Sequence, residues 1–505
     1  MNVVFIYPEC ENLGVAYLSA CLKKAGHHVK LAFDPMLFDS YYFRSNGLKK
    51  IFSFRSRVIN EVLSAQYDLV CFSVFADHYG WACDIAAEIK NKNKNIRIIF
   101  GGVHPSSVPE LVIQEPFVDY VCVGEGELPM VELADRLQQG ADDTGILNIW
   151  TKSNGRVIKN ELRPLLLDLD ALPFPDKEIF RDEYKNFSGK VYSIITARGC
   201  PNACTYCYNS YFRELYRDKG PYLRRRSVDN VIAELVHAKE KYGIQRVAFF
   251  DDLFIYDLNW LQEFSGKYSE KIGLPYFCHV HPSNINERSV QLLKASGCST
   301  VTMGIQTINE DIRKKILDRH DSNEQICKAV KLIKGSGIFL YTNIIFGLPL
   351  QDENVMVEDI RFANHFRVDI PASNWLRYYP RTEIVRIAKD LAVLNAGDID
   401  TMEESKAYMP YSIDGNTYGK NGAKLRNMLL LTHLLPEKWA DYILDHRLYK
   451  FLPSFNLRFY IQILIITYRK IFLGKKFPFA YLSLMDIVQY HLHYMFKKVC
   501  SRGVA

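Results

Sequence analysis

The sequence predicts an α/β protein with two parallel-sheet units followed by a helical region. Residues 1–145 alternate apolar strand-like runs with helix-like runs, which favours a parallel sheet with helices on both faces. Residues 191–400 repeat this rhythm, and their strand candidates fit a full or partial β/α barrel. With 48% hydrophobic and 24% charged residues, the 505-residue chain has the composition of a folded protein with a large core. That composition excludes a mostly disordered, collagen-like or coiled-coil chain.

The elements expected in the first unit end in glycines and polar residues. The predicted strands are Asn2–Ile6, Val29–Phe33, Leu69–Val74, Ile96–Phe100 and Tyr120–Val123, with helices at Leu13–Ala25 and Trp81–Lys90. In parallel sheets of this kind, ligands bind beyond the carboxyl ends of the strands. The residues that gather there, and that we select as candidate ligand contacts, are Gly14, Ser73, Gly101, Gly102, His104, Gly124, Glu125 and Gly126.

Three further regions complete the chain. Residues 146–190 are predicted to be a connector, because Leu172–Asp176 contains two prolines and forms a stiff turn. The expected barrel strands are Val191–Thr196, Arg246–Phe250, Tyr276–Val280, Thr300–Gly304, Phe339–Phe346 and Ser373–Tyr378. Residues 401–505 are predicted to be helical, aromatic and basic.

The strongest chemical signal is a cysteine cluster directly after the first barrel strand. Cys200, Cys204 and Cys207 lie on a loop that is crowded with glycine, proline and asparagine, unlike a packed core segment with structural thiols. Three thiolates on one loop can hold three irons of a 4Fe–4S cluster and leave the fourth iron open for an outside ligand. A structural zinc site needs four protein ligands, and the chain has no second paired-cysteine motif.

This loop resembles the cluster-binding motif of radical S-adenosylmethionine (SAM) enzymes, and the resemblance extends over residues 191 to about 390. It implies that SAM chelates the open iron and is cleaved to a 5′-deoxyadenosyl radical. Tyr206 occupies the aromatic position that lies near the adenine in that family.

Weaker matches follow the later barrel strands. The resemblance implies that Asp251 and Asp252 contact the amino end of SAM, that Gln306 contacts its ribose, and that Arg319 binds its carboxylate. Gly347 begins a turn that resembles the family's adenine-side turn. Solvated surface charges and a plain tight turn remain the alternatives for these residues.

The first unit resembles the cobalamin-binding domain of one large subgroup of radical SAM enzymes. The resemblance is carried by Asn12–Leu18, Gly101–Pro105 and Gly124–Pro129, with Leu172–Pro175 and Arg224–Ser227 later in the chain. It implies a Rossmann-like cobalamin-binding domain, a radical SAM partial (β/α)6 TIM barrel and a helical C-terminal region. The glycines would let the backbone approach a flat corrin ring closely. The chain lacks an Asp-x-His-x-x-Gly segment, so no histidine from that motif would bind the cobalt. His104 is either a cobalamin contact or a turn histidine.

The resemblance implies a cobalamin-dependent radical SAM enzyme, and the most frequent activity in this subgroup is methyl transfer to an unactivated carbon. A radical SAM cyclase or rearrangement enzyme with the same domains, or a methylthiotransferase, stays open. Outside enzymes, a cobalamin- or Fe–S-binding regulator is the alternative. The expected cofactors are a 4Fe–4S cluster, SAM and cobalamin, and the expected partners are a small-molecule substrate and an external electron donor of the flavodoxin or ferredoxin type.

The C-terminal tail carries the chain's positive charge, because residues 451–505 hold eight Lys and Arg against one Asp. Interleaved basic, aromatic and aliphatic residues suit either a helix on an anionic membrane surface or a helical cap on the barrel. Single-stranded nucleic acid is not expected, since Ile461–Ile466 is too apolar. The N-terminus resembles a buried strand rather than a signal peptide. We therefore expect a cytoplasmic protein. A further hypothesis is that the tail makes peripheral contact with the inner face of the membrane, in which case a lipid or isoprenoid substrate is expected.

Overall fold

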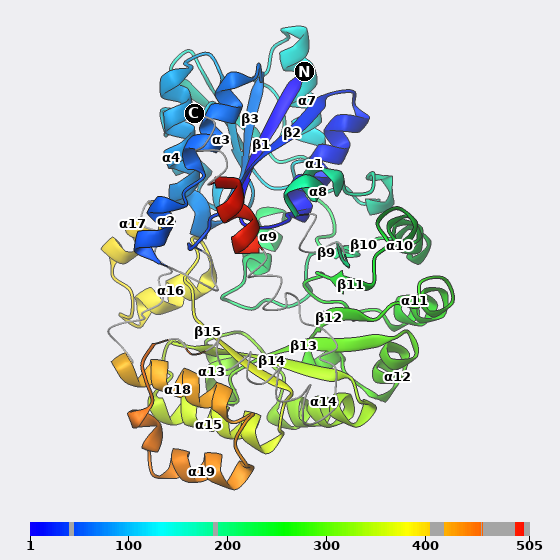
Figure 1. Cartoon of the computed structure of the whole chain (residues 1–505), viewed down its shortest axis with the longest axis vertical. Coiled ribbons are helices and arrows are strands. Elements are labelled where there is room, and N and C mark those ends of the chain that lie inside the picture. Colours follow the sequence, from blue (N-terminus) through cyan, green and yellow to red (C-terminus); the bar gives the residue numbers. More distant parts are fainter. Residues whose placement is uncertain (40–44, 185–189, 405–418, 456, 458–489, 499–505) are drawn as a thin grey trace.

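The computed structural model describes the chain except for residues 40–44, 185–189, 405–418, 456, 458–489 and 499–505. In Figure 1 the N-terminal sheet lies at the top and the second sheet below it, with helix α9 and the short β9–β10 ribbon between them. The α/β fold class is confirmed. Among the described residues, no helix is long and apolar enough to cross a membrane.

The N-terminal sheet has seven strands in the order β2-β1-β3-β4-β5-β6-β7. Its parallel part comprises β1 (Asn2–Pro8), β2 (His28–Asp34), β3 (Leu69–Ser73), β4 (Arg97–Gly101) and β5 (Tyr120–Cys122). Apart from the edge strand β2, these strands are mostly buried, because helices cover both faces of the sheet. The predicted strands and helices of this unit are found within three residues of their expected ends.

The helices that cover the N-terminal sheet pack into two separate apolar cores. One face carries α3 (Arg55–Ser64) and α4 (Tyr79–Lys92). The other carries α1 (Leu13–Lys24) and α7 (Glu127–Gln139). Asn12 begins α1 as its N-cap, since its side chain accepts a hydrogen bond from the N–H of Val15 at 2.8 Å. The short helices of this unit are α2 (Asn46–Ile51), α5 (Val103–Ser107), α6 (Pro109–Val112) and the 3-10 turn η1 (Ala76–His78).

The predicted connector is more ordered than its sequence suggests. Two of its segments, β6 (Ile149–Ser153) and β7 (Arg156–Lys159), form an antiparallel hairpin that extends the N-terminal sheet beyond β5. The remainder contains η2 (Leu169–Ala171) and α8 (Glu178–Tyr184). The stiff turn docks on the first helix, because Asp176 accepts a hydrogen bond from the Ser19 hydroxyl at 2.6 Å.

The second sheet has six parallel strands in the order β8-β11-β12-β13-β14-β15, as a partial barrel requires. They are β8 (Val191–Ile194), β11 (Arg246–Phe249), β12 (Tyr276–Val280), β13 (Cys298–Gln306), β14 (Phe339–Phe346) and β15 (Ile370–Trp375). The last strand begins three residues before the predicted Ser373. The short ribbon pairs β9 (Ala197–Arg198) with β10 (Arg224–Arg225).

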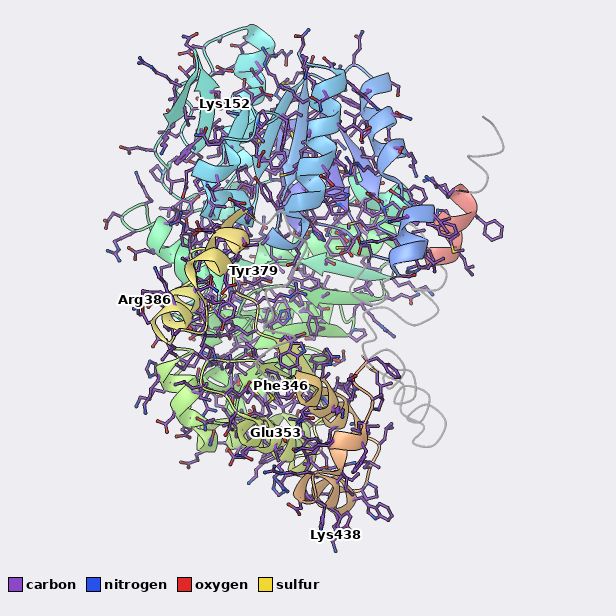
Figure 2. The ribbon with its side chains drawn as sticks, turned by 90° about the vertical axis from the view of Figure 1, so that its left-hand side faces the viewer. Lys152, Phe346, Glu353, Tyr379, Arg386 and Lys438 are labelled. Atoms are coloured by element: carbon purple, nitrogen blue, oxygen red, sulfur yellow. The ribbon has the colours of Figure 1, made fainter. Side chains whose placement is uncertain are left out.

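Helices cover the outer face of this sheet and continue into the C-terminal region. The helices whose apolar residues join the core of this sheet are α10 (Val228–Tyr242), α11 (Leu258–Lys271), α12 (Glu287–Ala295), α14 (Asn323–Ser336), α15 (Glu353–His365), α18 (Gly419–Leu431) and α19 (Glu437–Asp445), with the 3-10 turn η4 (Leu448–Phe451). The other helices are α9 (Tyr208–Leu215), α13 (Glu310–Lys315), α16 (Glu383–Asp390) and α17 (Ala396–Glu404), with the 3-10 turn η3 (Pro282–Asn284). Figure 2 places Lys438 of α19 at the far end from Lys152 of the N-terminal hairpin.

The last described helical segment, residues 490–498, packs on the N-terminal unit and not on the barrel. The Tyr490 hydroxyl donates to the Pro35 carbonyl at 3.0 Å, and the Tyr494 ring meets the Phe54 ring at a centroid distance of 5.6 Å. Both figures draw this segment against the first helices of the chain. The predicted barrel cap is therefore corrected for these residues. Residues 458–489 lie outside the described part, so membrane contact stays a prediction, and the described residues give no support to a lipid substrate.

Candidate functional site

The cysteine loop begins where β9 ends, at Gly199. This glycine has a φ of +88°, and a Cβ at this position would stand 2.5 Å from the carbonyl oxygen of Tyr222. The chain therefore needs glycine directly before Cys200, because both the backbone conformation and the space exclude a side chain. The other end of the loop turns tightly, with the Cys207 N–H donating to the Cys204 carbonyl at 3.1 Å.

Hydrogen bonds to the segment after α13 and from α9 hold this loop in place. The Thr205 hydroxyl donates to the Ile316 carbonyl at 2.7 Å, just beyond α13. The guanidinium of Arg213, on α9, donates to the carbonyls of Pro201 and Asn202. Three loop residues are thus fixed by hydrogen bonds that do not use the thiols, so the sulfur atoms are not needed to hold the loop in place.

The three thiols lie close enough for Cys204 to act electrostatically on both Cys200 and Cys207. Among the described residues, no three His, Cys, Asp or Glu side chains converge as one metal ion requires. A 4Fe–4S cluster makes a different demand, since each cysteine binds its own iron. Burial raises the pKa of Cys200 and Cys204, and raises that of Cys207 to about 11. Bound iron would deprotonate these thiols, because metals bind cysteine as the thiolate.

The structure brings three of the predicted SAM contacts together beside Cys204. The Arg319 guanidinium donates to the Gly304 carbonyl at 2.8 Å and lies close enough to Cys204 to lower the pKa of that thiol. Tyr206 hydrogen-bonds to Arg319, and burial raises the pKa of its phenol. Gln306 completes the group, because its amide lies 2.5 Å from where a Cβ on Gly304 would stand.

Gln306 itself has a strained backbone. Its φ of +68° lies in the left-handed region, which non-glycine residues seldom adopt. The register between β13 and β14 shifts at the same place, between Gly304 and Gln306. Strain of this kind persists where the surrounding structure enforces it and is concentrated at functional sites. This observation supports Gln306 as a site residue independently of the sequence motif.

The two neighbouring aspartates after β11 have different surroundings. Asp251 is 1% exposed and accepts hydrogen bonds from the Thr196 N–H and the Ala197 N–H, each at 2.6 Å. We therefore withdraw it as a direct SAM contact and assign it to holding the turn before the cysteine loop. Asp252 is exposed within the site, and desolvation by the surrounding protein raises its carboxyl pKa. It acts electrostatically on Cys200 and Cys207 and remains a candidate.

The turn at Gly347 is fixed by a buried hydrogen-bond network. The Gly347 N–H donates to Gln351 Oε1 at 2.8 Å, and Gln351 Nε2 donates to Asp359 at 3.2 Å. Asp359, on α15, also accepts from the Thr307 hydroxyl at 3.0 Å and from the Ile308 N–H at 2.6 Å. One carboxyl thus joins the turns that follow β13 and β14, the two turns predicted to meet the ribose and the adenine.

Asp359 predicts a pH-dependent stability. Burial raises its pKa to about 7, whereas an unfolded aspartate has a pKa of about 3.9. The folded state therefore retains a proton that the unfolded state has lost, and the free energy of unfolding should fall as the pH rises from about 4 to 7. Because Asn does not titrate, Asp359→Asn should lose this contribution. Urea unfolding from pH 4.5 to 8 should show the variant gaining stability relative to the natural protein as the pH rises.

A neighbouring variant controls for this measurement. Asp352→Asn keeps the N-cap of the same helix, because asparagine caps as well as aspartate. It should follow the natural protein across the pH range. A stability difference for Asp359→Asn that does not change with pH would contradict the assignment.

The cobalamin residues predicted after β3 and β4 form a close backbone contact. Gly102 has a φ of +95°, and a Cβ there would stand 2.8 Å from the Val74 N–H nitrogen and 3.3 Å from the Ser73 hydroxyl. A Cβ at Gly101 would approach Cys122 at 3.3 Å. These glycines therefore let the ends of neighbouring strands pack closely at the carboxyl edge of the sheet, and their role as cobalamin contacts stays a prediction. Gly14 lies at the start of α1, beside Asn12.

His104 does not face this crevice. It is fully buried, and its ring contacts that of Tyr79 at a centroid distance of 4.4 Å. Neither ring nitrogen has a hydrogen-bond partner in the described part of the chain, and burial lowers its pKa to about 4. A ring with no exposed surface cannot touch a bound corrin, so we withdraw His104 as a cobalamin contact.

The segment after β5 joins the two units. The Glu125 carboxylate forms a bidentate ion pair with the Arg224 guanidinium, with N–O distances of 2.6 and 3.1 Å. A guanidinium nitrogen of Arg198 lies 3.2 Å from the same carboxylate. Burial alone would raise the pKa of Glu125, but both guanidinium groups outweigh it and hold this pKa below its usual range. Arg198 also pairs with Glu127. Because Arg198 is two residues before Cys200, this ion-pair network ties the N-terminal unit to the cysteine loop.

Gly124 and Gly126, on either side of Glu125, are closely packed. The Tyr216 hydroxyl accepts a hydrogen bond from the Glu125 N–H at 2.7 Å and would lie 1.9 Å from a Cβ on Gly124. A Cβ on Gly126 would meet Leu18 at 3.1 Å. These glycines are predicted cobalamin contacts, whereas the structure packs Gly124 against Tyr216 of the second unit and Gly126 against Leu18 within the N-terminal unit. Arg198 and Tyr216 were missed at this junction, since no local pattern in the sequence marks their partners.

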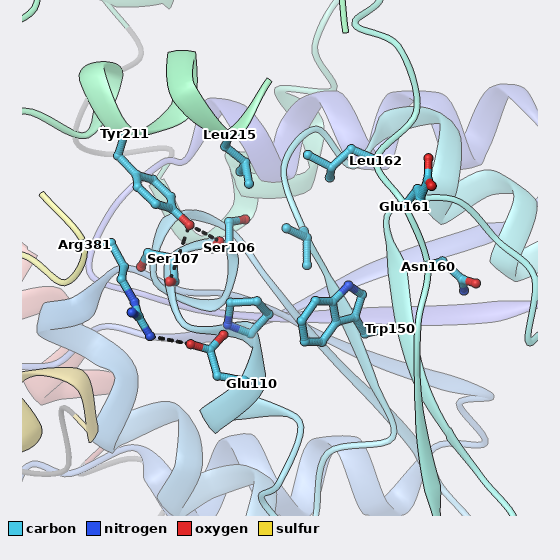
Figure 3. A pocket seen from close by; sticks show the side chains of 12 residues that line it. Ser106, Ser107, Glu110, Trp150, Asn160, Glu161, Leu162, Tyr211, Leu215 and Arg381 are labelled. Atoms are coloured by element: carbon cyan, nitrogen blue, oxygen red, sulfur yellow. Dashed lines mark hydrogen bonds and ion pairs between the residues drawn. The ribbon is translucent and has the colours of Figure 1, made fainter. Parts of the chain in front are cut away.

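A cavity of about 430 Å³ lies beside this junction (Figure 3). Arg381 pairs with Glu110 at one side, and the Tyr211 hydroxyl donates to the Ser106 carbonyl at 3.2 Å. Trp150 of the hairpin forms the opposite wall. None of the predicted cofactor residues lines this cavity.

Comparison with known proteins identifies both units. Residues 2–134 match the B12 binding domain, and residues 194–363 match the radical SAM superfamily. An uncharacterized methyltransferase of Pyrococcus horikoshii is 29% identical over 76% of this chain and 82% of its own length. The anaerobic magnesium-protoporphyrin IX monomethyl ester cyclase of Rubrivivax gelatinosus is 24% identical over 75% of this chain and 68% of its own.

Other curated relatives are named as methyltransferases, and one as a putative methylthiotransferase. Among solved structures, the cobalamin-dependent SAM radical enzyme OxsB, with aqua-cobalamin and SAM bound, superposes with a TM-score of 0.65 over 100% of this chain and 80% of its own at 15% identity. At that identity the likeness concerns the fold. The two matched domains imply a 4Fe–4S cluster, SAM and cobalamin as cofactors.

Proposed function

We propose that this chain, a cobalamin-dependent radical SAM enzyme that joins a B12-binding domain to a radical SAM domain, is a methyltransferase acting on an unactivated carbon of a small molecule. When bound, the cluster and SAM supply a 5′-deoxyadenosyl radical, and the cobalamin supplies the methyl group. The chain's own contribution is to hold these groups around one substrate. Radical SAM enzymes also need a reductant, which an external electron donor of the flavodoxin or ferredoxin type would provide.

The observation that carries the proposal is the ion-pair network between Glu125, Arg198 and Arg224. It anchors the carboxyl end of the B12-binding sheet to the residues just before Cys200. Hydrogen abstraction and methyl delivery must reach the same substrate carbon from two cofactors, and such a reaction depends on their relative position. Fixed ion pairs between the two domains supply that positioning.

Each site residue has a distinct task in this proposal. Cys200, Cys204 and Cys207 hold the cluster. Arg319 presents its guanidinium beside Cys204, where it would bind the SAM carboxylate, and Gln306 lies close enough to orient the ribose. Tyr206, held by Arg319, would pack near the adenine.

An anaerobic assay tests methyl transfer while the substrate is still unidentified. The holoenzyme is incubated with reductant, methyl-deuterated SAM and a small-molecule extract of the source cells. A methyltransferase should place the labelled methyl group on a product and release 5′-deoxyadenosine and S-adenosylhomocysteine in proportion to it. Deoxyadenosine release without any labelled product would contradict the proposal.

The second candidate is a cyclase or rearrangement enzyme, which the Rubrivivax relative favours. It predicts a substrate-dependent loss of hydrogen or a rearranged product with no labelled methyl group, so the same assay distinguishes it. A methylthiotransferase would carry a second cluster, and about eight irons per chain would support it where about four support one cluster. A chain that releases no deoxyadenosine with SAM and reductant would favour a binding or regulatory protein.

A further inference from the structure

Asn209 places two donors on the sulfur of Cys207. It lies two residues beyond that cysteine, in the first turn of α9, and its Nδ2 donates to Cys207 Sγ at 3.7 Å. Its backbone N–H donates to the same sulfur and lowers the pKa of the thiol, which burial otherwise raises to about 11. Among the described residues, Cys207 is the cysteine of the loop that receives a side-chain amide.

The orientation of this amide is fixed. The Tyr222 hydroxyl donates to Asn209 Oδ1 at 2.8 Å, which leaves the NH₂ group on the side of the sulfur. A flipped amide would set its oxygen against the sulfur and the Asp252 carboxylate, which are both acceptors. The same amide also hydrogen-bonds to Asp252.

Tyr222 links this arrangement to the other end of the loop. Its carbonyl oxygen occupies the space beside Gly199, the residue before Cys200. A single residue of the segment before β10 thus contacts the backbone next to the first cysteine and orients the donor to the third. The donor geometry is part of the loop's architecture and does not depend on a surface side chain.

Hydrogen bonds to cluster sulfurs have a known electrostatic consequence. Reduction adds an electron, which makes the ligand sulfurs more negative. N–H donors stabilise the reduced cluster more than the oxidised one and raise the reduction potential.

We propose that Asn209 is a positioning residue that sets the reduction potential of the cluster through its hydrogen bonds to Cys207. The inference rests on Cys207 as a cluster ligand, and therefore on the radical SAM part of the proposed function, but not on methyl transfer. An electron donor of a given potential would reduce the cluster less completely without this residue.

The test is a reductive titration of the anaerobic holoprotein, followed by visible absorbance and electron paramagnetic resonance. Asn209→Leu keeps the size of the side chain and removes its amide donor. At a fixed ambient potential its ratio of reduced to oxidised cluster should fall about tenfold, which is about 59 mV for a one-electron couple. The matched control is Ser210→Ala, because the Ser210 hydroxyl donates at 2.7 Å to the carbonyl of Cys207 and not to its sulfur. Its potential should equal that of the natural protein.

A second variant covers the case in which Asn209→Leu fails to hold a cluster. Tyr222→Phe retains Asn209 but removes one of the hydrogen bonds that orient its amide, and should shift the potential in the same direction by less. Natural-protein potentials in both variants, or in Tyr222→Phe when Asn209→Leu lacks iron, would overturn the inference. Failure of the proposed function gives a different result, namely a natural protein that binds no cluster or releases no deoxyadenosine.

Discussion

Replacement of any one of Cys200, Cys204 and Cys207 by Ala is expected to abolish 5′-deoxyadenosine formation completely. Each thiolate of a cluster with three cysteine ligands binds a separate iron, so none can substitute for another. The surrounding loop should stay folded, because hydrogen bonds to the carbonyls of Ile316, Pro201 and Asn202 hold it without the thiols. The measurements are iron content, visible absorbance and deoxyadenosine release after anaerobic reconstitution.

Cys10 provides the control for these variants. It is an exposed free cysteine in the loop after β1 and is not part of the cysteine loop. Cys10→Ser should retain about four irons per chain and the activity of the natural protein. A loss of about half of eight irons in this variant would instead reveal a second cluster and favour a methylthiotransferase. Full deoxyadenosine release by any of the three alanine variants would contradict the cluster assignment.

Gly124→Ala is expected to destabilise the contact between the two domains strongly. The new Cβ would stand 1.9 Å from the Tyr216 hydroxyl, and the φ of +81° is unfavourable for alanine. The left-handed backbone alone costs about 1–2 kcal/mol, and displacing Tyr216 from the Glu125 N–H costs about 1–3 kcal/mol more. We expect a loss of about 3 kcal/mol or more, measured by urea unfolding with a fluorescence probe.

Two further variants separate the causes of that loss. Gly140→Ala shares the left-handed backbone, with φ +63°, but its Cβ would meet nothing within 4 Å. It should therefore show the backbone cost alone. In a Tyr216→Ala background the space beside Gly124 is empty, and Gly124→Ala should cost no more than Gly140→Ala. Equal losses for Gly124→Ala and Gly140→Ala in the natural background would contradict the steric account.

The strands that the sequence predicted best are those with clear alternation and no special residue. Tyr276–Val280 and Phe339–Phe346 match the structure residue for residue, because their burial alternates along the strand. The strand β15 was placed too late, since Pro371 and the small polar residues after it disguise its start. Proline is tolerated there because β15 is the edge of the sheet.

The β6–β7 hairpin was missed although the sequence carries its signal. Asn154 and Gly155 form its turn with positive φ values of 50° and 74°. Asn-Gly between two apolar runs is the strongest short-range sign of a hairpin. The prolines at 173 and 175 favour irregular backbone only where they stand, so they say nothing about the residues of the hairpin.

Site residues differ in how far a sequence can reveal them. The cysteine spacing is local, so Cys200, Cys204 and Cys207 could be selected without a fold. Glu125 and Arg224 meet across 99 positions of sequence, and Asp359 joins two turns from a separate helix. Such contacts are determined by packing, and only the folded chain shows them. For the same reason His104 was predicted to be a crevice residue although its ring enters the core.

The packing of residues 490–498 on the N-terminal unit has a consequence for synthesis on the ribosome. Phe33 and Phe54 are covered by Tyr494, which leaves the ribosome more than 400 residues after either of them. At a translation rate of about 5–20 residues per second, this apolar surface stays uncovered for roughly 20 to 90 s before Tyr494 is synthesised. During that interval the nascent N-terminal domain therefore exposes an apolar surface that chaperones can bind. Its maturation is completed only after the whole barrel has been translated.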